Sequence, residues 1–339
     1  MKTLIELQKK LYPDLLKIMQ QRYSVLYSID LFQPIGRRGL AENTNLTERI
    51  VRSEVDFLQE QGFIQVTAKG MYMTKEGKLL VDQLASFMSE ITGLSGLERQ
   101  LTSALPIEDC IVVPGDSDVH DWVKQEMGKA CVSHLKTTLG PGQTIGVTGG
   151  TTMAAVAAMM VPLEMTEPPL FVPARGGLGE KAENQANTIV AEMARKAKGD
   201  YRLLYVPDPL SEASYQSMIN EPSVKDILQL IKHSDVILHG IGDALTMAKR
   251  RKTTPEIIEK LRTNKAISEA FGYYFDADGN IVHKVRTIGI QLEDLASINH
   301  VITVAGGQSK AQAITSYFQD SKSDMLITDE AAAKAILRG

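Results

Sequence analysis

The feature that most constrains the fold is an alternation that fills the last two thirds of the chain. Short apolar runs, typical of strands, alternate there with longer stretches rich in helix formers. The predicted strands cover residues 110–113, 144–148, 170–172, 203–206, 236–239, 301–304 and 325–328. The predicted helices between them include residues 122–139, 184–197, 224–232 and 311–318. Because continuous apolar strands are typical of a parallel sheet covered on both faces, the pattern predicts a doubly wound α/β domain.

Glycine-bearing turns follow several of these predicted strands, with the sequences VTGGTT, VPARGGLGE, LHGIGDA and VAGGQSK. In an open α/β sheet such turns gather at the carboxyl ends of the strands, where ligands bind. Arg175 and Lys310 stand in two of them, so both can bring positive charge into a shared crevice. For any single turn the simpler interpretation is a tight bend beside a solvated cation. Because several turns converge, we favour a common ligand site.

The turn at residues 149–152 is suited to an anion. Its two glycines let a ligand approach the backbone, and the helix that follows offers unpaired amides and two threonine hydroxyls. The turn is not a Walker A loop, because no Gly-Lys-Ser/Thr follows it, and LHGIGDA lacks the third glycine of a dinucleotide fingerprint. We therefore expect a phosphorylated ligand and no nucleotide cofactor.

The N-terminal third predicts a helix-turn-helix followed by a two-stranded wing. A helix over residues 13–30 and a second, short helix precede a polar turn at residues 43–46. Thr47 is a suitable N-cap for the next helix, which Gly62 ends. The apolar face of that helix repeats through Val51, Val55 and Leu58. The segments FIQVT and GMYMT then form the wing, and Thr74 caps another helix.

The opposite face of the helix after Thr47 is charged. A helix with exposed arginines can lie in the major groove of double-stranded DNA, where arginine reads guanine edges or contacts phosphates. The alternative is a small helical interaction module with a solvated charged face. The net charge of −4 argues against binding of DNA by overall charge, so a local surface must do it. The residues predicted to contact DNA are Arg37, Arg38, Thr47, Glu48, Arg49, Arg52 and Ser53.

Length and composition indicate how many domains the chain has and where the protein is expected to be located. A chain of 339 residues exceeds what one hydrophobic core usually organises. We place the winged helix at residues 1–83, an amphipathic linker helix at 84–106 and the α/β ligand-binding domain at 107–339.

No apolar run could span a bilayer and the N-terminus lacks a signal sequence, so a cytoplasmic protein without a membrane partner is expected. Cys110 and Cys131 have no metal-site spacing, so no metal is expected.

Beyond these patterns, the chain resembles the SorC family of bacterial repressors, with a recognition helix similar to that of DeoR-type regulators. The resemblance rests on LTERIVRSEVDFLQEQGFI, VTGGTT, FVPARGGLGE, YRLLYVP, SEAFGYYFDADGNIVHKV, VAGGQSKAQAI and LITDEAAAKAIL. It implies a winged helix joined to a sugar-binding domain similar to phosphosugar isomerases. The effector-binding residues that it implies are Gly149, Gly150, Thr151, Thr152, Arg175, Arg250, Glu269 and Lys310.

The same resemblance implies what this protein binds and regulates. The implied effector is fructose 1,6-bisphosphate or a related sugar phosphate, and the implied target is the operon of glyceraldehyde-3-phosphate dehydrogenase. The resemblance also implies homodimers that assemble to tetramers on double-stranded operator DNA. On this interpretation the chain is a repressor of glycolytic genes whose DNA binding responds to a sugar phosphate.

The rival function is a phosphosugar isomerase or deaminase. Such an enzyme needs an acid–base group against C1 and C2 of the sugar, for which the candidates are Glu269, His239 and Asp243. Nothing in their spacing marks a catalytic pair, and a lone histidine after an apolar strand is more often a satisfied buried residue. An enzyme also has no evident use for a winged helix. We therefore predict a regulator without catalytic residues.

The segment that starts at Asp276 opens like a calcium loop. The twelfth position of such a loop requires a glutamate that binds through both oxygens, and this chain has Thr287 there. The sequence instead predicts a hairpin turn between FGYYF and IVHKV.

Overall fold

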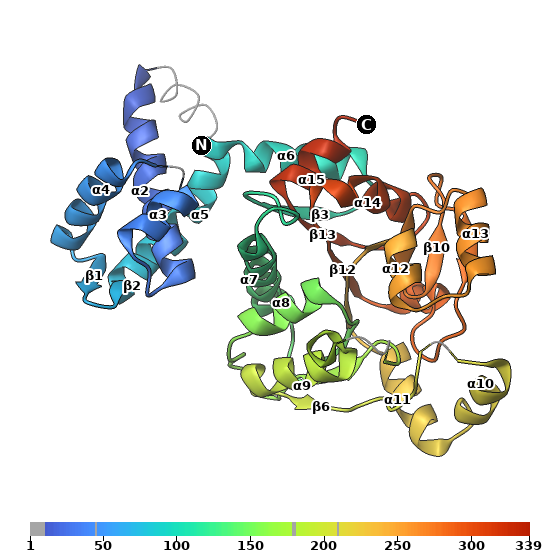
Figure 1. The fold of residues 1–339 in the computed structure, drawn as a ribbon. Coiled ribbons are helices and arrows are strands. Elements are labelled where there is room, and N and C mark those ends of the chain that lie inside the picture. Colours follow the sequence, from blue (N-terminus) through green and yellow to red (C-terminus); the bar gives the residue numbers. More distant parts are fainter. Residues whose placement is uncertain (1–10, 45, 178–180, 209) are drawn as a thin grey trace. The chain divides into compact units, whose positions relative to one another are not determined.

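The computed structural model describes residues 11–44, 46–177, 181–208 and 210–339 (Figure 1). The chain divides into two compact units, Met1–Gly96 and Leu97–Gly339. Asn45 of the predicted polar turn, the last three residues of VPARGGLGE and the N-terminal residues 1–10 lie outside the described residues. Within the described part of the chain, no helix is both long and apolar enough to cross a membrane.

The N-terminal unit is a winged helix. Its elements are α2 (Pro13–Phe32), α3 (Arg37–Thr44), α4 (Glu48–Glu60), β1 (Ile64–Thr67), β2 (Gly70–Met73) and α5 (Lys75–Thr92). Val51 and Val55 of α4 are fully buried in the same core as Val25 and Ile29 of α2. The antiparallel pair of β1 and β2 forms the wing. The helix-turn-helix and the wing expected from the sequence are therefore confirmed.

Threonine caps begin two of these helices. The hydroxyl of Thr47 accepts a hydrogen bond from the amide of Ile50 at 3.4 Å, and that of Thr74 accepts one from Gly77 at 3.1 Å. Each bond satisfies a first-turn amide that has no partner within its own helix. Gly62 lies just beyond α4 with a φ of +77°, the left-handed conformation typical of that position. The structure thus confirms both predicted caps and the predicted helix end.

The segment 84–106, predicted as one linker helix, is divided between two helices. α5 already begins upstream of this segment, and α6 (Leu94–Ala104) follows it. Between them Gly93 adopts a φ of +87°, and its amide donates to the carbonyl of Ser89 at 3.1 Å. A glycine in the left-handed conformation ends a helix, and apolar periodicity that continues across it does not reveal the break.

A seven-stranded parallel sheet forms the centre of the C-terminal unit (Figure 1). Its strands in spatial order are β3 (Asp109–Val113), β13 (Met325–Asp329), β12 (His300–Val304), β7 (Val236–His239), β4 (Thr144–Val147), β5 (Leu170–Pro173) and β6 (Asp200–Tyr201). Every residue of β7 and β13 is buried, as expected of strands covered on both faces. The predicted doubly wound α/β domain is confirmed.

Helices pack on this sheet, and the order of its strands creates a crevice. The helices are α7 (Asp121–Thr138), α8 (Thr151–Met159), α9 (Ala186–Ala197), α11 (Pro222–Lys232), α14 (Ala311–Phe318) and α15 (Glu330–Ile336). α8 contacts both α7 and α9, whereas α14 packs with α15. From β4 the chain proceeds outward to β5 and β6, then returns to β7 on the other side of β4. The carboxyl ends of β4 and β7 therefore flank a topological switch point, the usual ligand position in such sheets.

A smaller antiparallel sheet belongs to the same unit. In spatial order its strands are β11 (Ile281–Lys284), β10 (Tyr273–Phe275), β9 (Ser268–Ala270) and β8 (Gly242–Asp243). α12 (Ala244–Arg250) and α13 (Pro255–Thr263) enclose a small core with it around Tyr274 and Leu261. A carboxylate oxygen of Asp276 accepts hydrogen bonds from the amides of Asp278 at 3.0 Å and Asn280 at 2.9 Å. This turn joins β10 to β11, so the predicted hairpin is confirmed.

Residues 203–206 are not a strand, contrary to the sequence prediction. The sheet ends at β6, and the side chain of Asn187 then takes the place of a strand partner. Asn187 accepts from the amide of Leu204 at 3.1 Å and donates to its carbonyl at 3.0 Å. Leu204 and Val206 are buried, so the apolar signal reflects packing rather than sheet pairing. The remaining short elements are α10 (Glu212–Met218), η1 (Ala182–Asn184), η2 (Leu292–Ser297) and η3 (Gln308–Lys310).

Candidate functional site

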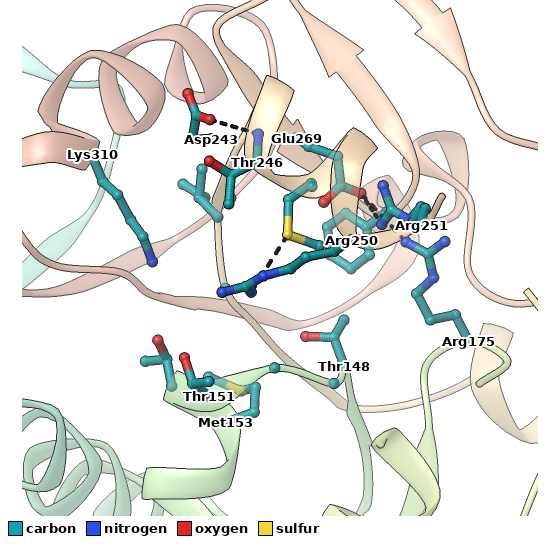
Figure 2. Close-up of a pocket in the computed structure, with 18 of the residues that line it drawn as sticks. Thr148, Thr151, Met153, Arg175, Asp243, Thr246, Arg250, Arg251, Glu269 and Lys310 are labelled. Atoms are coloured by element: carbon teal, nitrogen blue, oxygen red, sulfur yellow. Dashed lines mark hydrogen bonds and ion pairs between the residues drawn. The ribbon is translucent and has the colours of Figure 1, made fainter. Parts of the chain in front are cut away.

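A cavity of about 230 Å³ lies at the switch point between β4 and β7 (Figure 2). Its walls are the turns that follow β4, β5, β7 and β12, together with α12 and the hairpin between β9 and β10. The structure brings the whole predicted effector set to this one cavity: Gly149, Gly150, Thr151, Thr152, Arg175, Arg250, Glu269 and Lys310. Convergence of the glycine-bearing turns, the main expectation of the sequence analysis, is thus observed.

The first turn of α8 forms one wall. Gly150 precedes the helix with a φ of +114°, which favours glycine, and its amide donates to the carbonyl of Asn184 at 2.9 Å. Gly149 packs closely against the backbone of Asn184, because a Cβ on Gly149 would be 2.7 Å from the same carbonyl oxygen. The amides of Thr151 and Thr152 belong to the first turn, where a helix supplies no acceptor of its own. Together with the helix dipole they make this wall suited to a phosphate group.

Two cations face that wall. Lys310 and Arg250 reach into the space above Thr151 from different elements, the turn after β12 and the end of α12 (Figure 2). Desolvation lowers the pKa of Lys310 below its ordinary value of 10.5, and the positive charges of Lys124 and Arg250 lower it further. The negative charges of Asp118 and Asp329 oppose this shift. An anion bound between Lys310 and Arg250 would relieve their mutual repulsion, so the arrangement favours an anionic ligand.

The other end of the cavity holds a buried network of charges around Glu269. One carboxylate oxygen, Oε1, accepts from Arg251 Nη2 at 2.6 Å, from the amide of Gly272 at 2.7 Å and from Arg175 Nη1 at 3.4 Å. Burial alone would raise the pKa of Glu269, but the charges of Arg251 and Arg175 outweigh it and lower the pKa. Glu269 is therefore a fixed negative charge at pH 7, whose carboxylate can also accept hydrogen bonds from sugar hydroxyls.

Two members of this network were not among the predicted residues. Arg251 donates to the hydroxyl of Tyr274 at 2.9 Å, and Asp208 accepts from Nε of Arg175 at 2.8 Å. Arg251 follows Arg250 directly, and sequence alone does not tell which of two adjacent arginines turns inward. Asp208 stands in an irregular segment far from its partner along the chain, and no local signal marks it.

The hairpin turn between β9 and β10 supports this network. Phe271 and Gly272 both have positive φ values, 54° and 89°, as in the tight turns that suit two-residue hairpin loops. The positive φ is unusual for phenylalanine, and its ring is buried against that of His239 with 4.5 Å between ring centres. The turn thereby places the amide of Gly272 against Glu269 and lines the cavity with Phe271.

The three acid–base candidates of the rival enzyme function, Glu269, His239 and Asp243, each have structural partners and do not form a catalytic set. His239 is fully buried, lies 2.7 Å from the hydroxyl of Thr303, and has its pKa lowered by burial to about 4. It is a neutral core residue, as expected from the sequence. Asp243 caps α12 by accepting from the amide of Thr246 at 2.8 Å, while Glu269 is held by two arginines. Among the described residues, no group of acidic, histidine or cysteine side chains is arranged to hold a metal ion.

In the N-terminal unit, the predicted DNA-contacting residues are exposed on α3, at the N-cap Thr47 and on α4. Glu48, Arg49, Arg52 and Ser53 are exposed on α4, opposite its buried apolar face. Arg37 and Arg38 are exposed on α3, where Arg37 lies 3.7 Å from Asp56 and Arg38 lies 3.3 Å from Glu42. Such exposed ion pairs contribute little stability, so both arginines can exchange these carboxylates for phosphates.

Comparison with known proteins relates both units to one family. A model of sugar-binding domains matches residues 89–338, and a model of the CggR N-terminal DNA binding domain matches residues 18–88. The chain is 54% identical over 339 residues to the central glycolytic genes regulator of Priestia megaterium, and 51% identical over 338 residues to that of Bacillus subtilis. Both alignments cover 100% of this chain and 99% of the relative. The chain belongs to the family of central glycolytic genes regulators.

A solved structure supports the same assignment for the ligand-binding unit. A SorC family transcriptional regulator from Enterococcus faecalis matches with a TM-score of 0.68 and 46% sequence identity, covering 71% of this chain and 99% of the other. As a member of this family, the protein is a transcriptional regulator of glycolytic genes with a sugar-binding domain, and not an enzyme. Its winged helix is the DNA-binding domain, and the cavity lies in the sugar-binding domain.

Proposed function

We propose that the cavity binds fructose 1,6-bisphosphate, or a closely related sugar phosphate, and that this binding weakens or reorganises the complex of the winged helix with operator DNA. The observation that carries the proposal is the pairing of the first turn of α8 with Lys310 and Arg250 across one cavity. Backbone amides and two cations together provide the donors and the charge that a phosphate dianion needs.

The rest of the cavity fits the remainder of such a ligand. Glu269 offers a buried carboxylate to sugar hydroxyls, and Arg175 and Arg251 beside it offer guanidinium groups to a second anionic group. Phe271 adds an apolar ring to the wall. A sugar with phosphates at both ends uses all of these features, whereas a monophosphate leaves either the α8 wall with its two cations or the N–H donors of Arg175 and Arg251 unused.

The target is proposed to be the operator of a glycolytic operon that includes glyceraldehyde-3-phosphate dehydrogenase. Homodimers that assemble to tetramers on the DNA are proposed because paired half-sites mirror the symmetry of the protein that binds them. Coupling between a ligand site and a DNA site typically amounts to about 1–3 kcal/mol, which changes operator affinity roughly 5- to 150-fold. The effector is therefore expected to shift operator binding over a range that a gel-shift assay resolves.

One combined experiment tests this function. Melting temperatures of the full chain are measured with fructose 1,6-bisphosphate, fructose 6-phosphate and inorganic phosphate, and operator binding is then titrated with the best ligand. Thr152→Ala and Lys310→Ala are expected to blunt the ligand response while leaving operator binding intact. Equal loss of DNA binding in both variants would contradict the assignment of the cavity, and absence of any stabilisation by sugar phosphates would contradict the effector.

A further inference from the structure

Arg175 lines the cavity, and behind it lies the buried carboxylate of Asp208. Nε and Nη2 of Arg175 both donate to one oxygen, Oδ2, of Asp208, with 2.8 Å from Nε. The side chains are 5% exposed for Arg175 and 0% for Asp208, so water and salt screen this pair little. Among the described residues, the second oxygen of Asp208 has no hydrogen-bond partner. Asp208 therefore has Arg175 as its main electrostatic partner.

The pair fixes which part of the guanidinium group remains for a ligand. Arginine carries about five N–H donors in a rigid fork. Asp208 occupies the edge formed by Nε and Nη2, and Nη1 faces Glu269 at 3.4 Å, which is long for a hydrogen bond. A Cβ on Gly272 would be 3.2 Å from Nη2 and 3.5 Å from Nη1, so backbone also packs closely against the group. The fork cannot turn freely, and its remaining N–H donors are those on Nη1 and Nη2.

Glu269 cannot hold Arg175 in this way by itself. Its oxygen Oε1 is already engaged by Arg251 at 2.6 Å and by the amide of Gly272 at 2.7 Å. Without Asp208, the charge of Arg175 would depend on the longer contact to Glu269 alone. A buried guanidinium with half of its counter-charge missing is unfavourable and free to seek another position.

We propose that Asp208 is a positioning residue for the effector: it holds the fork of Arg175 so that the remaining donors meet an anionic group of the sugar phosphate. The inference rests on the proposed function of the cavity. Asp208 does not touch the ligand on this view, and its influence on affinity passes through Arg175. The ion pair thereby makes the turn after β5 and the irregular segment after residue 203 parts of the same ligand site.

A double-mutant cycle on the full chain tests the proposal. Affinity for fructose 1,6-bisphosphate is measured by isothermal titration for Asp208→Ala, Asp208→Asn, Arg175→Ala and the double variant Arg175→Ala/Asp208→Ala. Asp208→Ala is expected to lower affinity at least about tenfold, which corresponds to about 1.4 kcal/mol. Asp208→Asn, whose amide oxygen still accepts from Nε but carries no charge, is expected to lose less affinity than Asp208→Ala. The exposed Asp226→Asn on α11 serves as a matched control without effect.

The double variant separates positioning from a general structural role. It removes the whole ion pair and leaves neither of the two charges without its partner, so it is expected to fold even if Asp208→Ala is too unstable to titrate. If Asp208 acts through Arg175, the double variant binds no more weakly than Arg175→Ala alone. Additive losses, or unchanged affinity of Asp208→Ala, would overturn the proposal. Absence of binding by the unmodified protein would contradict the proposed function itself, and this inference with it.

Discussion

The amide of Ser309 donates to the carboxylate of Asp118 at 2.7 Å and so ties the turn after β12 to the turn after β3. A second tie lies close by, where the amide of Gly307 donates to Asp329 at 2.7 Å. Lys310 follows these anchored residues directly, so its backbone is fixed before any ligand arrives. Because this cation is preorganised, less conformational entropy is lost when it binds an anion.

The lowered pKa of Lys310 predicts how effector binding depends on pH. A lysine contributes its charge below its pKa, and desolvation moves that pKa below the ordinary 10.5. Affinity for fructose 1,6-bisphosphate should therefore fall as the pH rises, and the decline should begin below pH 10.5. Titrations between about pH 7 and pH 10 check this, and Lys310→Arg should flatten the alkaline decline because arginine stays charged. An identical decline in both proteins would assign the effect to another group.

Gly149 should tolerate no side chain. A Cβ at this position would be 2.7 Å from the carbonyl oxygen of Asn184, which must then move together with the start of α8. Gly149→Ala is expected to lower effector affinity at least about tenfold and to lower the melting temperature. Gly96→Ala is the matched control, since nothing lies within 4 Å of its Cβ in α6. That control should gain about 0.5–1 kcal/mol of stability from improved helix propensity. Equal affinity of both variants would contradict the tight contact.

Arg52 on α4 should matter for DNA and not for the sugar phosphate. The residue is exposed on the helix that enters the major groove in proteins of this type. Arg52→Ala is expected to reduce specific operator binding by about 1–3 kcal/mol, measured by gel shift against competitor DNA. Stabilisation by fructose 1,6-bisphosphate should be unchanged. Arg195→Ala, at an exposed position of α9, is the matched control and should leave both activities intact.

Removal of Arg251 should be costly for folding. Arg251→Ala leaves the buried Glu269 with the amide of Gly272 and, as its counter-charge, the longer contact to Arg175. Breaking a buried pair in this way typically costs about 3–5 kcal/mol. Chemical denaturation at pH 7 measures the loss. The lowered pKa of Glu269 means that the carboxylate contributes stability above about pH 4.5, which is lost as the pH falls through its folded pKa. The difference between the two proteins should therefore shrink in acid, and a constant difference would point to lost packing instead.

Much of the fold was predictable because its determinants are local. Neighbouring residues determine the caps at Thr47 and Thr74 and the helix end at Gly62. The central strands of the sheet are recognisable in the sequence as apolar runs. The same rule produced the error at residues 203–206, because an apolar run shows burial and not hydrogen-bond pairing. There the side chain of Asn187 supplies the bonds that a strand would have made.

The candidate site was predictable in part. The turn at residues 149–152 shows its chemistry in its own sequence, and family resemblance added Glu269 and Arg250. Asp208 was missed because its role depends on one contact with Arg175, which is 33 residues away along the chain. The tie between Ser309 and Asp118 joins residues 191 positions apart. Pairings of this kind depend on the assembled sheet, and a single sequence does not reveal them.

The cavity is walled by turns from β4, β5, β7 and β12, which are spread along the chain from Thr148 to Lys310. A ligand held by all four is lost as soon as any one strand separates from the others. A bound ligand therefore raises the free-energy cost of each partial opening that separates these strands, and such openings are what proteases exploit. If the proposed sugar phosphate binds there, its concentration would set how long this regulator survives in the cell as well as how much of it is bound to DNA.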